Sequence, residues 1–250
     1  MVAIDSILFR PLLLAFAASQ SSFHEQSTIK MTDSAESIIS KLRSLGMEKK
    51  DMPHIADRRR ASVLVPLFER VVAAVGDNDS AISNSNSLHV LLTQRPQNMK
   101  SHGGEVCFPG GKQDPEDEGD DVRTAMREAH EEVGLHPQHV ESISRMESLE
   151  SKHGLCVTPI IGLISPSSVA EPSQLTLNAD EVEAAFAVPL EYFVDPENCD
   201  SAVPVNWGGK NFLLRTYLYD DPESGRQFKI WGFTAHVVHE VAMKAFAVHH

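Results

Sequence analysis

Short apolar runs separated by polar turns dominate the hydrophobic pattern of the chain. Runs of this length that are rich in β-branched residues predict strands. They cover residues 61–68, 88–93, 140–146, 155–164, 212–219 and 227–230. Helical spacing is found at 34–45, which ends at Gly46, at 120–133 and at 237–248. Strands outnumber helices and no internal repeat is present, so the pattern predicts an α+β fold with helices covering a mixed sheet.

The predicted helix in the middle of the chain has two different faces. At about 100° per residue, its apolar side chains share one stripe that faces the core. They are Val122, Ala125, Met126, Ala129 and Val133. Glu128, Glu131 and Glu132 share another face, because positions i, i+3 and i+4 are neighbours on a helix. Aspartates 120–121 can cap its N-terminus, and Gly134 can end it.

Three neighbouring carboxylates near a helix C-terminus are unfavourable by themselves. Like charges one turn apart repel by a few tenths of a kcal/mol, and negative charge there opposes the helix dipole. The hard divalent cations Mg²⁺ and Mn²⁺ bind carboxylate oxygens and would remove this penalty. Taken alone, the pattern also fits a solvated acidic surface.

A glycine-rich segment at 103–111 favours the first interpretation. Its four glycines allow backbone N–H groups to approach a phosphate closely. The segment is not a Walker P-loop, because Gln113 stands after Lys112 where that motif has Ser or Thr. A glycine loop, a connector and a helix with three carboxylates together suggest a metal-clamped pyrophosphate site.

Composition narrows the class of protein. The 250 residues are 42% hydrophobic and carry 35 acidic against 22 basic side chains, a formal charge of −13. Such a negative chain repels phosphate backbones and anionic lipid, so we expect neither nucleic acid nor membrane as a partner. Three widely spaced cysteines without a CxxC pair support neither a disulfide framework nor a thiolate zinc site.

Residues 1–33 differ from the rest of the chain. Their apolar run at 7–18 is shorter than the roughly 20 residues that a membrane-spanning helix needs. We expect a targeting segment or a disordered extension here, and a single globular domain at 34–250. A targeting segment would indicate a mitochondrial or other organellar location; without one the expected location is the cytoplasm.

The segment from Gly110-Gly111 to Leu135 resembles the Nudix box, G-x5-E-x7-R-E-U-x-E-E-x-G-U, where U is apolar. Its second half, Arg127 to Leu135, matches at every specified position. The first half is two residues longer than the pattern, which puts Gly119 where the first Glu belongs and leaves acidic residues at 116–118 beside it.

A second stretch resembles one branch of this family. Residues 91–96 (LLTQRP) and 102–111 (HGGEVCFPGG) are similar to the signature of Nudix pyrophosphatases that act on coenzyme A. The resemblance implies a Nudix-type α/β/α sandwich with a mixed sheet and a loop-helix-loop motif. It implies hydrolysis of coenzyme A or acyl-CoA to 3′,5′-ADP and (acyl-)4′-phosphopantetheine. ADP-ribose or a dinucleoside polyphosphate is an alternative substrate, and a catalytically silent binding module is an alternative of another class.

The resemblance also suggests roles for the charged residues. Glu128 and Glu132 would bind Mg²⁺ or Mn²⁺, with Glu131 sharing a second ion. Arg127 would orient a carboxylate of the box. Glu131 or Glu181 would act as the general base, and Glu181 fits a plain surface residue equally well.

The remaining candidates would contact the substrate. The Arg95 guanidinium can bridge two phosphate oxygens, although a structural ion pair at a strand end would also explain it. Gly110 and Gly111 are expected to bind the substrate through their backbone. His102, beside the start of the glycine segment, is either a phosphate contact or a turn residue. The sequence leaves the oligomeric state open between monomer and homodimer.

Overall fold

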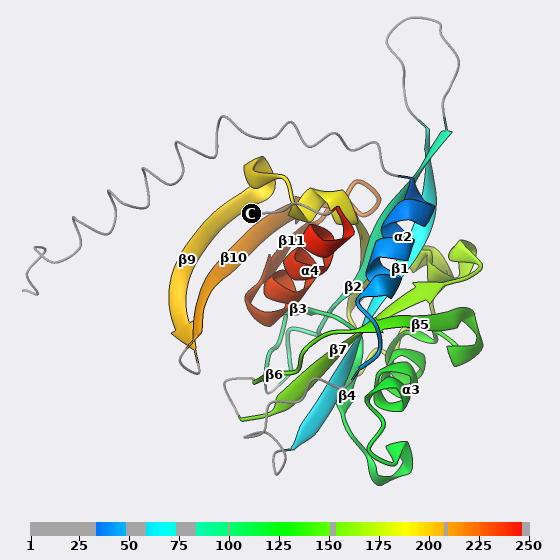
Figure 1. The fold of residues 1–250 in the computed structure, drawn as a ribbon, viewed down its shortest axis with the longest axis vertical. Helices are drawn as coiled ribbons and strands as arrows, with labels where there is room; N and C mark the ends of the chain where they lie inside the picture. Colours follow the sequence, from blue (N-terminus) through cyan, green and yellow to red (C-terminus); the bar gives the residue numbers. More distant parts are fainter. Residues whose placement is uncertain are drawn as a thin grey trace, which may run out of the picture. The chain divides into compact units, whose positions relative to one another are not determined.

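The computed structural model, drawn in Figure 1, describes residues 34–48, 59–73, 84–99, 101–150, 154–207 and 210–246. The expected targeting or disordered extension at 1–33 lies outside these ranges. None of the described helices combines the length and apolar character needed to cross a membrane.

The larger of two sheets has eight strands and mixed direction. Its main path runs β3-β2-β1-β7-β5, with β4 on β1, β6 on β7 and β8 on β2. The strands are β1 (Arg60–Ala73), β2 (Asn84–Gln94), β3 (Val106–Cys107), β4 (Gly110–Lys112), β5 (Val140–Arg145), β6 (Leu149–Glu150), β7 (Cys156–Ile164) and β8 (Ala184–Pro189). Strands β1 and β7 are parallel and the other pairs are antiparallel.

A second, three-stranded antiparallel sheet has the order β11-β10-β9. It consists of β9 (Cys199–Trp207), β10 (Lys210–Asp220) and β11 (Gln227–Trp231). The α-helices are α2 (Ala35–Ser44), α3 (Asp121–Val133) and α4 (Gly232–Ala245). Short 3₁₀ helices are η2 (Pro115–Asp117), η3 (Pro137–His139), η4 (Ser167–Ala170), η5 (Pro172–Gln174), η6 (Leu190–Phe193) and η7 (Pro196–Asn198).

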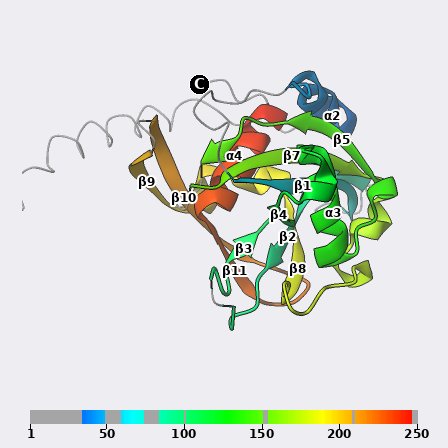
Figure 2. The ribbon, with the colours of Figure 1, turned by 90° about the horizontal axis from the view of Figure 1, so that it is seen from below.

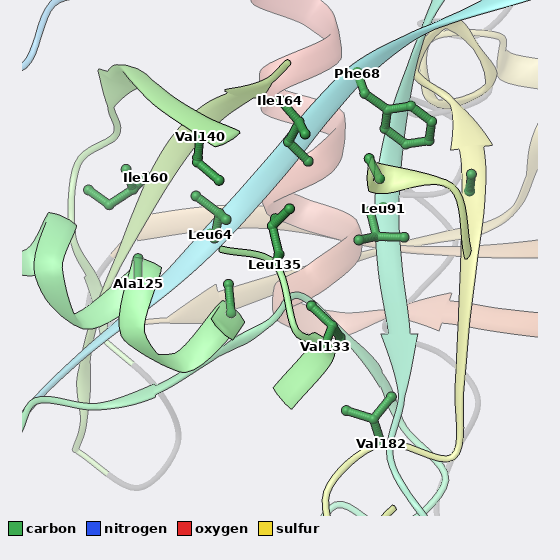
Figure 3. Close-up of a cluster of buried hydrophobic side chains, with 13 residues drawn as sticks. Leu64, Phe68, Leu91, Ala125, Val133, Leu135, Val140, Ile160, Ile164 and Val182 are labelled. Carbon is green, nitrogen blue, oxygen red and sulfur yellow. The ribbon is translucent and has the colours of Figure 1, made fainter. Parts of the chain in front are cut away.

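Helices cover both faces of the larger sheet (Figures 1 and 2). Leu64 and Phe68 of β1 belong to the core cluster beneath α3, while the alternating Val65 and Leu67 are also fully buried. A strand buried on both faces needs a continuous apolar run, as β1 has. Figure 3 shows α3 in front of β1 and α4 behind it. The expected α/β/α sandwich with a mixed sheet is therefore confirmed.

Most predicted elements are present, with differences in the C-terminal half. Strands β8 and β9 were not predicted, because β8 is short and rich in alanine and β9 contains Pro204 and several polar residues. These compositions give a weak strand pattern. Helix α4 begins at Gly232, earlier than predicted, because a glycine and an aromatic residue give a poor helix signal. Residues 247–248 of that prediction lie outside the described ranges.

Candidate active site

Helix α3 is built as its sequence pattern predicts. The Asp120 carboxylate accepts a hydrogen bond from Val122 N at 2.8 Å, and Gly134 ends the helix with a φ of 71°. Ala125 and Ala129 are fully buried against the sheet. Because this stripe faces the core, the glutamates of the other face lie next to the glycine segment.

The glycine segment fits closely around two of these glutamates. Gly110 N donates a hydrogen bond to Glu132 Oε2 at 3.1 Å, and the Glu132 side chain is only 3% exposed. A Cβ atom on Gly111 would lie 2.4 Å from the carboxyl carbon of Glu128. Glycine at 111 thus leaves the room that the Glu128 carboxylate occupies.

Burial and mutual repulsion shape the electrostatics of this cluster. Burial raises the pKa of Glu132 to about 8, and the negative charges of Glu128 and Glu181 add to the increase. Burial also raises the pKa of Glu128, against the opposing effect of the Arg127 guanidinium, and the charges of Glu131 and Glu181 add to the increase. Glu181, distant in sequence, is therefore close enough to act electrostatically on both glutamates of α3. Buried glutamates whose negative charges repel one another in this way favour a bound cation.

The segment that carries Glu181 is anchored to the end of α3. Asn178 N donates a hydrogen bond to Glu132 O at 2.9 Å, and Glu181 N donates to Asn178 O at 3.0 Å. Val182 is buried in the core cluster beneath α3. These contacts place Glu181 beside the C-terminal end of the helix.

Arg127 orients several carboxylates at once. Its guanidinium lies 3.0 Å from Glu128 Oε1 and 3.0 Å from Glu131 Oε2. Its Nε and Nη2 donate to the two carboxylate oxygens of Asp117, each at 3.0 Å. The Asp117 side chain is 3% exposed, and the hydrogen bonds from Arg127 lower its pKa to about 2.

Asp117 explains the longer connector of the sequence motif. It ends the 3₁₀ helix η2, and Glu118 and Gly119 follow with φ values of 53° and 78°. Gly119, at the position of the motif's first Glu, forms a left-handed turn, and Asp117 is the acidic residue that meets Arg127. In the sequence, Asp117 lies between Glu116 and Glu118, which are exposed in the structure, and nothing in the sequence marks it as the buried residue of the three.

The predicted substrate contacts differ in their surroundings. Among the described residues, Arg95 Nε has no hydrogen-bond partner and is buried, while the residue as a whole is half-buried. The charge of Arg95 acts on Glu132 and on Cys107. His102 Nδ1 lies 2.9 Å from Glu105 Oε2, both side chains are exposed, and His102 has a φ of 57°. These features suit a turn residue.

A divalent cation fits the donor chemistry of Glu128 and Glu132, since both present carboxylate oxygens and their negative charges repel one another. Arg127 compensates part of the charge of Glu128. Glu131 is 54% exposed and contacts Arg127. Within the described ranges, no three His, Cys, Asp or Glu side chains converge into a complete metal-binding group. Mg²⁺ is commonly held by one or two carboxylates together with substrate phosphates, and two converging glutamates satisfy that requirement.

Substitution of Gly111 by alanine is expected to lower kcat about a hundredfold while leaving the protein folded. The added Cβ overlaps the Glu128 carboxylate, so this side chain must move away from its position beside Glu132. Steady-state kinetics and thermal unfolding of the purified variant measure both effects.

Gly119→Ala is the matched control. A Cβ at 119 meets nothing within 4 Å, but the φ of 78° is unfavourable for alanine and costs about 1 kcal/mol of stability. We expect this variant to lose stability and keep its kcat. Equal kcat values for Gly111→Ala and the wild type would contradict the assigned crowding of Glu128.

Comparison with known proteins agrees with this geometry. The NUDIX domain family matches residues 74–205. Peroxisomal coenzyme A diphosphatase NUDT7 of Mus musculus is 38% identical over 182 residues, which are 73% of this chain and 68% of the mouse protein.

Two proteins of Arabidopsis thaliana are also similar. Mitochondrial Nudix hydrolase 15 is 38% identical over 180 residues, covering 72% of this chain and 56% of that protein. Chloroplastic Nudix hydrolase 22 is 34% identical over 203 residues, covering 81% of this chain and 61% of that protein. The chain thus spans less than two thirds of the length of both plant relatives. The family match includes the glycine segment, the whole of α3 and Glu181, and the chain belongs to the Nudix hydrolase family.

Proposed function

We propose that this Nudix hydrolase cleaves the pyrophosphate bond of coenzyme A or acyl-CoA, giving 3′,5′-ADP and (acyl-)4′-phosphopantetheine. The observation that carries the proposal is the 102–111 segment, which resembles the coenzyme A signature and packs its Gly110 N–H against Glu132. The 38% identity to a mouse coenzyme A diphosphatase supports the same substrate class.

In this proposal, Glu128 and Glu132 hold Mg²⁺ or Mn²⁺. Bound divalent cations neutralise pyrophosphate charge, which otherwise repels an attacking nucleophile. Arg127 holds the carboxylates of α3 in place through its contacts with Asp117 and Glu128. Oriented groups of this kind lower the barrier by fixing geometry before the reaction.

Substrate binding is assigned to Arg95 and to the backbone of Gly110 and Gly111. The half-buried Arg95 guanidinium, whose charge acts on Glu132, can bridge two phosphate oxygens. His102 has a secondary role in shaping the turn. We assign the general base to Glu181, which accepts the proton of the attacking water. Its placement beside Glu128 and Glu132 supports this choice over Glu131, which is 54% exposed and contacts Arg127.

A substrate panel tests the proposal. Purified full-length protein is incubated with coenzyme A, acetyl-CoA, ADP-ribose and diadenosine tetraphosphate, each with Mg²⁺ or Mn²⁺, and products are identified by mass spectrometry. We expect 3′,5′-ADP and 4′-phosphopantetheine from coenzyme A, and no products with a chelator. Preferential cleavage of ADP-ribose would contradict coenzyme A as the substrate and would still support hydrolysis of a pyrophosphate bond. Absence of turnover on every compound would favour a binding module.

We further propose that residues 34–250 form the hydrolase domain and that residues 1–33 are an extension outside it. The names of the relatives place them in peroxisomes, mitochondria and chloroplasts, which supports an organellar location for this chain. Imaging of the full chain and of a variant lacking residues 1–33, each fused at its C-terminus to a fluorescent protein, tests whether that segment directs it there.

A further inference from the structure

The turn between β10 and β11 carries an arginine that contacts two segments of the candidate active site. Arg226 Nη2 donates hydrogen bonds to Gln94 Oε1 at 2.6 Å and to Glu183 Oε1 at 3.1 Å. Gln94 ends β2 and directly precedes Arg95, and Glu183 lies just after Glu181. One side chain from the smaller sheet therefore joins the segments that carry the proposed phosphate contact and the proposed base.

Both partners of Arg226 are in turn bonded to the loop at 95–105. Gln94 Nε2 donates to Gly104 O at 3.1 Å, and Glu183 Oε2 accepts a hydrogen bond from Gln97 N at 3.3 Å. Gly104 and the Gln97 side chain are closely packed, because a Cβ on Gly104 would lie 2.4 Å from the side-chain nitrogen Nε2 of Gln97. A shift of Gln94 or Glu183 would therefore disturb Gly104 and Gln97 together.

Arg226 is held in place by its own surroundings. Asp221 N donates to Arg226 O at 2.9 Å, and the Asp221 carboxylate accepts a hydrogen bond from Ser224 N at 3.0 Å. The guanidinium carbon lies 5.1 Å from the centroid of the Phe228 ring, and that ring is buried. A guanidinium already fixed against an aromatic ring loses little entropy on forming further hydrogen bonds. The ion pair with Glu183 is itself partly exposed, with 44% of the Arg226 and 37% of the Glu183 side chain accessible, and contributes little alone. The contact with Phe228 and the second hydrogen bond to Gln94 add to it.

We propose that Arg226 is a positioning residue for the reaction at this site. By bridging β2 and the residues after Glu181, it fixes Gln94, Gln97 and Gly104 around Arg95. The proposal rests on the proposed function for the identity of the substrate and for the role of Arg95 as a substrate contact. Glu128 and Glu132 lie on α3, and Glu181 is anchored to the end of α3 through Asn178, independently of Arg226. Loss of Arg226 therefore affects substrate binding at Arg95 more than the chemical step.

Kinetics of Arg226→Ala, Arg226→Lys and Lys229→Ala test this proposal. Lys229 is the charge control, because it is an exposed cation on β11 whose ammonium group lies 5.6 Å from the Trp231 ring. For Arg226→Ala we expect KM to rise about threefold to tenfold while kcat stays within about twofold. Arg226→Lys keeps the positive charge, but an ammonium group does not reproduce the planar guanidinium. Its KM should therefore lie between those of the wild type and the alanine variant. Lys229→Ala should leave KM unchanged.

Hydrogen exchange of the same proteins gives a second readout, which does not depend on the identity of the substrate. Exchange in peptides covering 95–106 should be about threefold to tenfold faster in Arg226→Ala, and unchanged in Lys229→Ala. If the wild type cleaves no coenzyme A but cleaves ADP-ribose, the KM comparison uses ADP-ribose; if it cleaves neither, exchange alone decides. Unchanged exchange in Arg226→Ala, or an equal rise in KM in Lys229→Ala, would overturn the proposal.

Discussion

Replacing Glu132 with glutamine is expected to lower kcat at least about a thousandfold while the fold stays intact. Glutamine has the same shape and keeps an oxygen that can accept the hydrogen bond from Gly110 N. It loses the negative charge that we assign to cation binding, and the charge stabilisation supplied by a bound divalent cation amounts to several kcal/mol. At 1.36 kcal/mol for each factor of ten, that loss corresponds to three or more orders of magnitude. Initial rates at saturating substrate and Mg²⁺ measure it.

Stability without divalent cations separates this role from a structural one. Burial raises the folded-state pKa of Glu132 from 4.5 to about 8, so the folded protein binds a proton that the unfolded chain releases. Glu132 therefore costs progressively more stability as the pH rises from about 4.5 towards 8. We expect Glu132→Gln to melt in chelator at or above the wild-type temperature at pH 7.5. Loss of activity accompanied by a lower melting temperature would instead indicate a structural role.

Glu240→Gln is the matched control for this substitution. Glu240 is exposed on α4 and pairs with Lys244 at 3.2 Å, so the same chemical change should leave kcat unaltered. A Glu132→Gln variant that keeps more than a tenth of the wild-type kcat would show that Glu132 is not a required cation ligand.

The sequence predicts helix α3 well because its information is local. An aspartate cap, an apolar stripe with the 3.6-residue period and a terminal glycine are all encoded between Asp120 and Gly134. The glutamate face follows from the same period. Once the helix is placed, the position of Glu128 and Glu132 beside the glycine segment requires only that β4 pair with β1.

Contacts between residues far apart in sequence could not be predicted in the same way. Arg60 stands directly before an apolar run, a sequence context typical of a solvated strand entry. Its guanidinium and that of Arg145 nevertheless both contact Asp121, at 3.1 Å and 2.6 Å. The Asp121 side chain is 5% exposed, although its sequence context is as acidic and polar as that of an exposed helix start. A charged group is buried only where the fold brings oppositely charged or hydrogen-bonding side chains to it. These side chains lie far away in the sequence, so no local pattern indicates them.

Arg226 illustrates the same limit within the candidate site. It stands in a polar turn after Pro222, where an arginine is unremarkable. Its contacts with Gln94 and Glu183 arise because β11 packs its buried Phe228 against Phe186 of β8, with ring centroids 3.8 Å apart. Strand β8 was itself not predicted, so the sequence offered no route to this contact.

Asp117→Asn is expected to lower the melting temperature by about 6–12 °C and kcat by about tenfold to a hundredfold. The substitution removes one charge from a buried ion pair and leaves Arg127 without its main partner, at a cost of about 3 kcal/mol. In a domain of this size each kcal/mol corresponds to about 2–4 °C. The kcat falls because Arg127 also orients Glu128 and Glu131. Thermal unfolding and steady-state kinetics measure the two effects.

The stability that Asp117 contributes should depend on pH. Hydrogen bonds from Arg127 lower the pKa of Asp117 from 3.8 to about 2 in the folded state. Its contribution is therefore complete above pH 3.8 and is lost as the pH falls towards 2. As the pH falls across that interval, the free energy of unfolding of Asp117→Asn should decrease by about 2 kcal/mol less than that of the wild type, at 1.36 kcal/mol per pH unit. Urea denaturation between pH 5 and 2.5 measures the difference.

Asp120→Asn is the control for both measurements. Asp120 belongs to the same acidic stretch, but its role is to cap α3 through Val122 N, and asparagine caps a helix about as well as aspartate. We expect its melting temperature and kcat to stay close to those of the wild type. If Asp120→Asn were as damaging as Asp117→Asn, the effect would follow from lost negative charge near α3. Asp117 would then have no specific part in holding Arg127 against the glutamates of the Nudix helix.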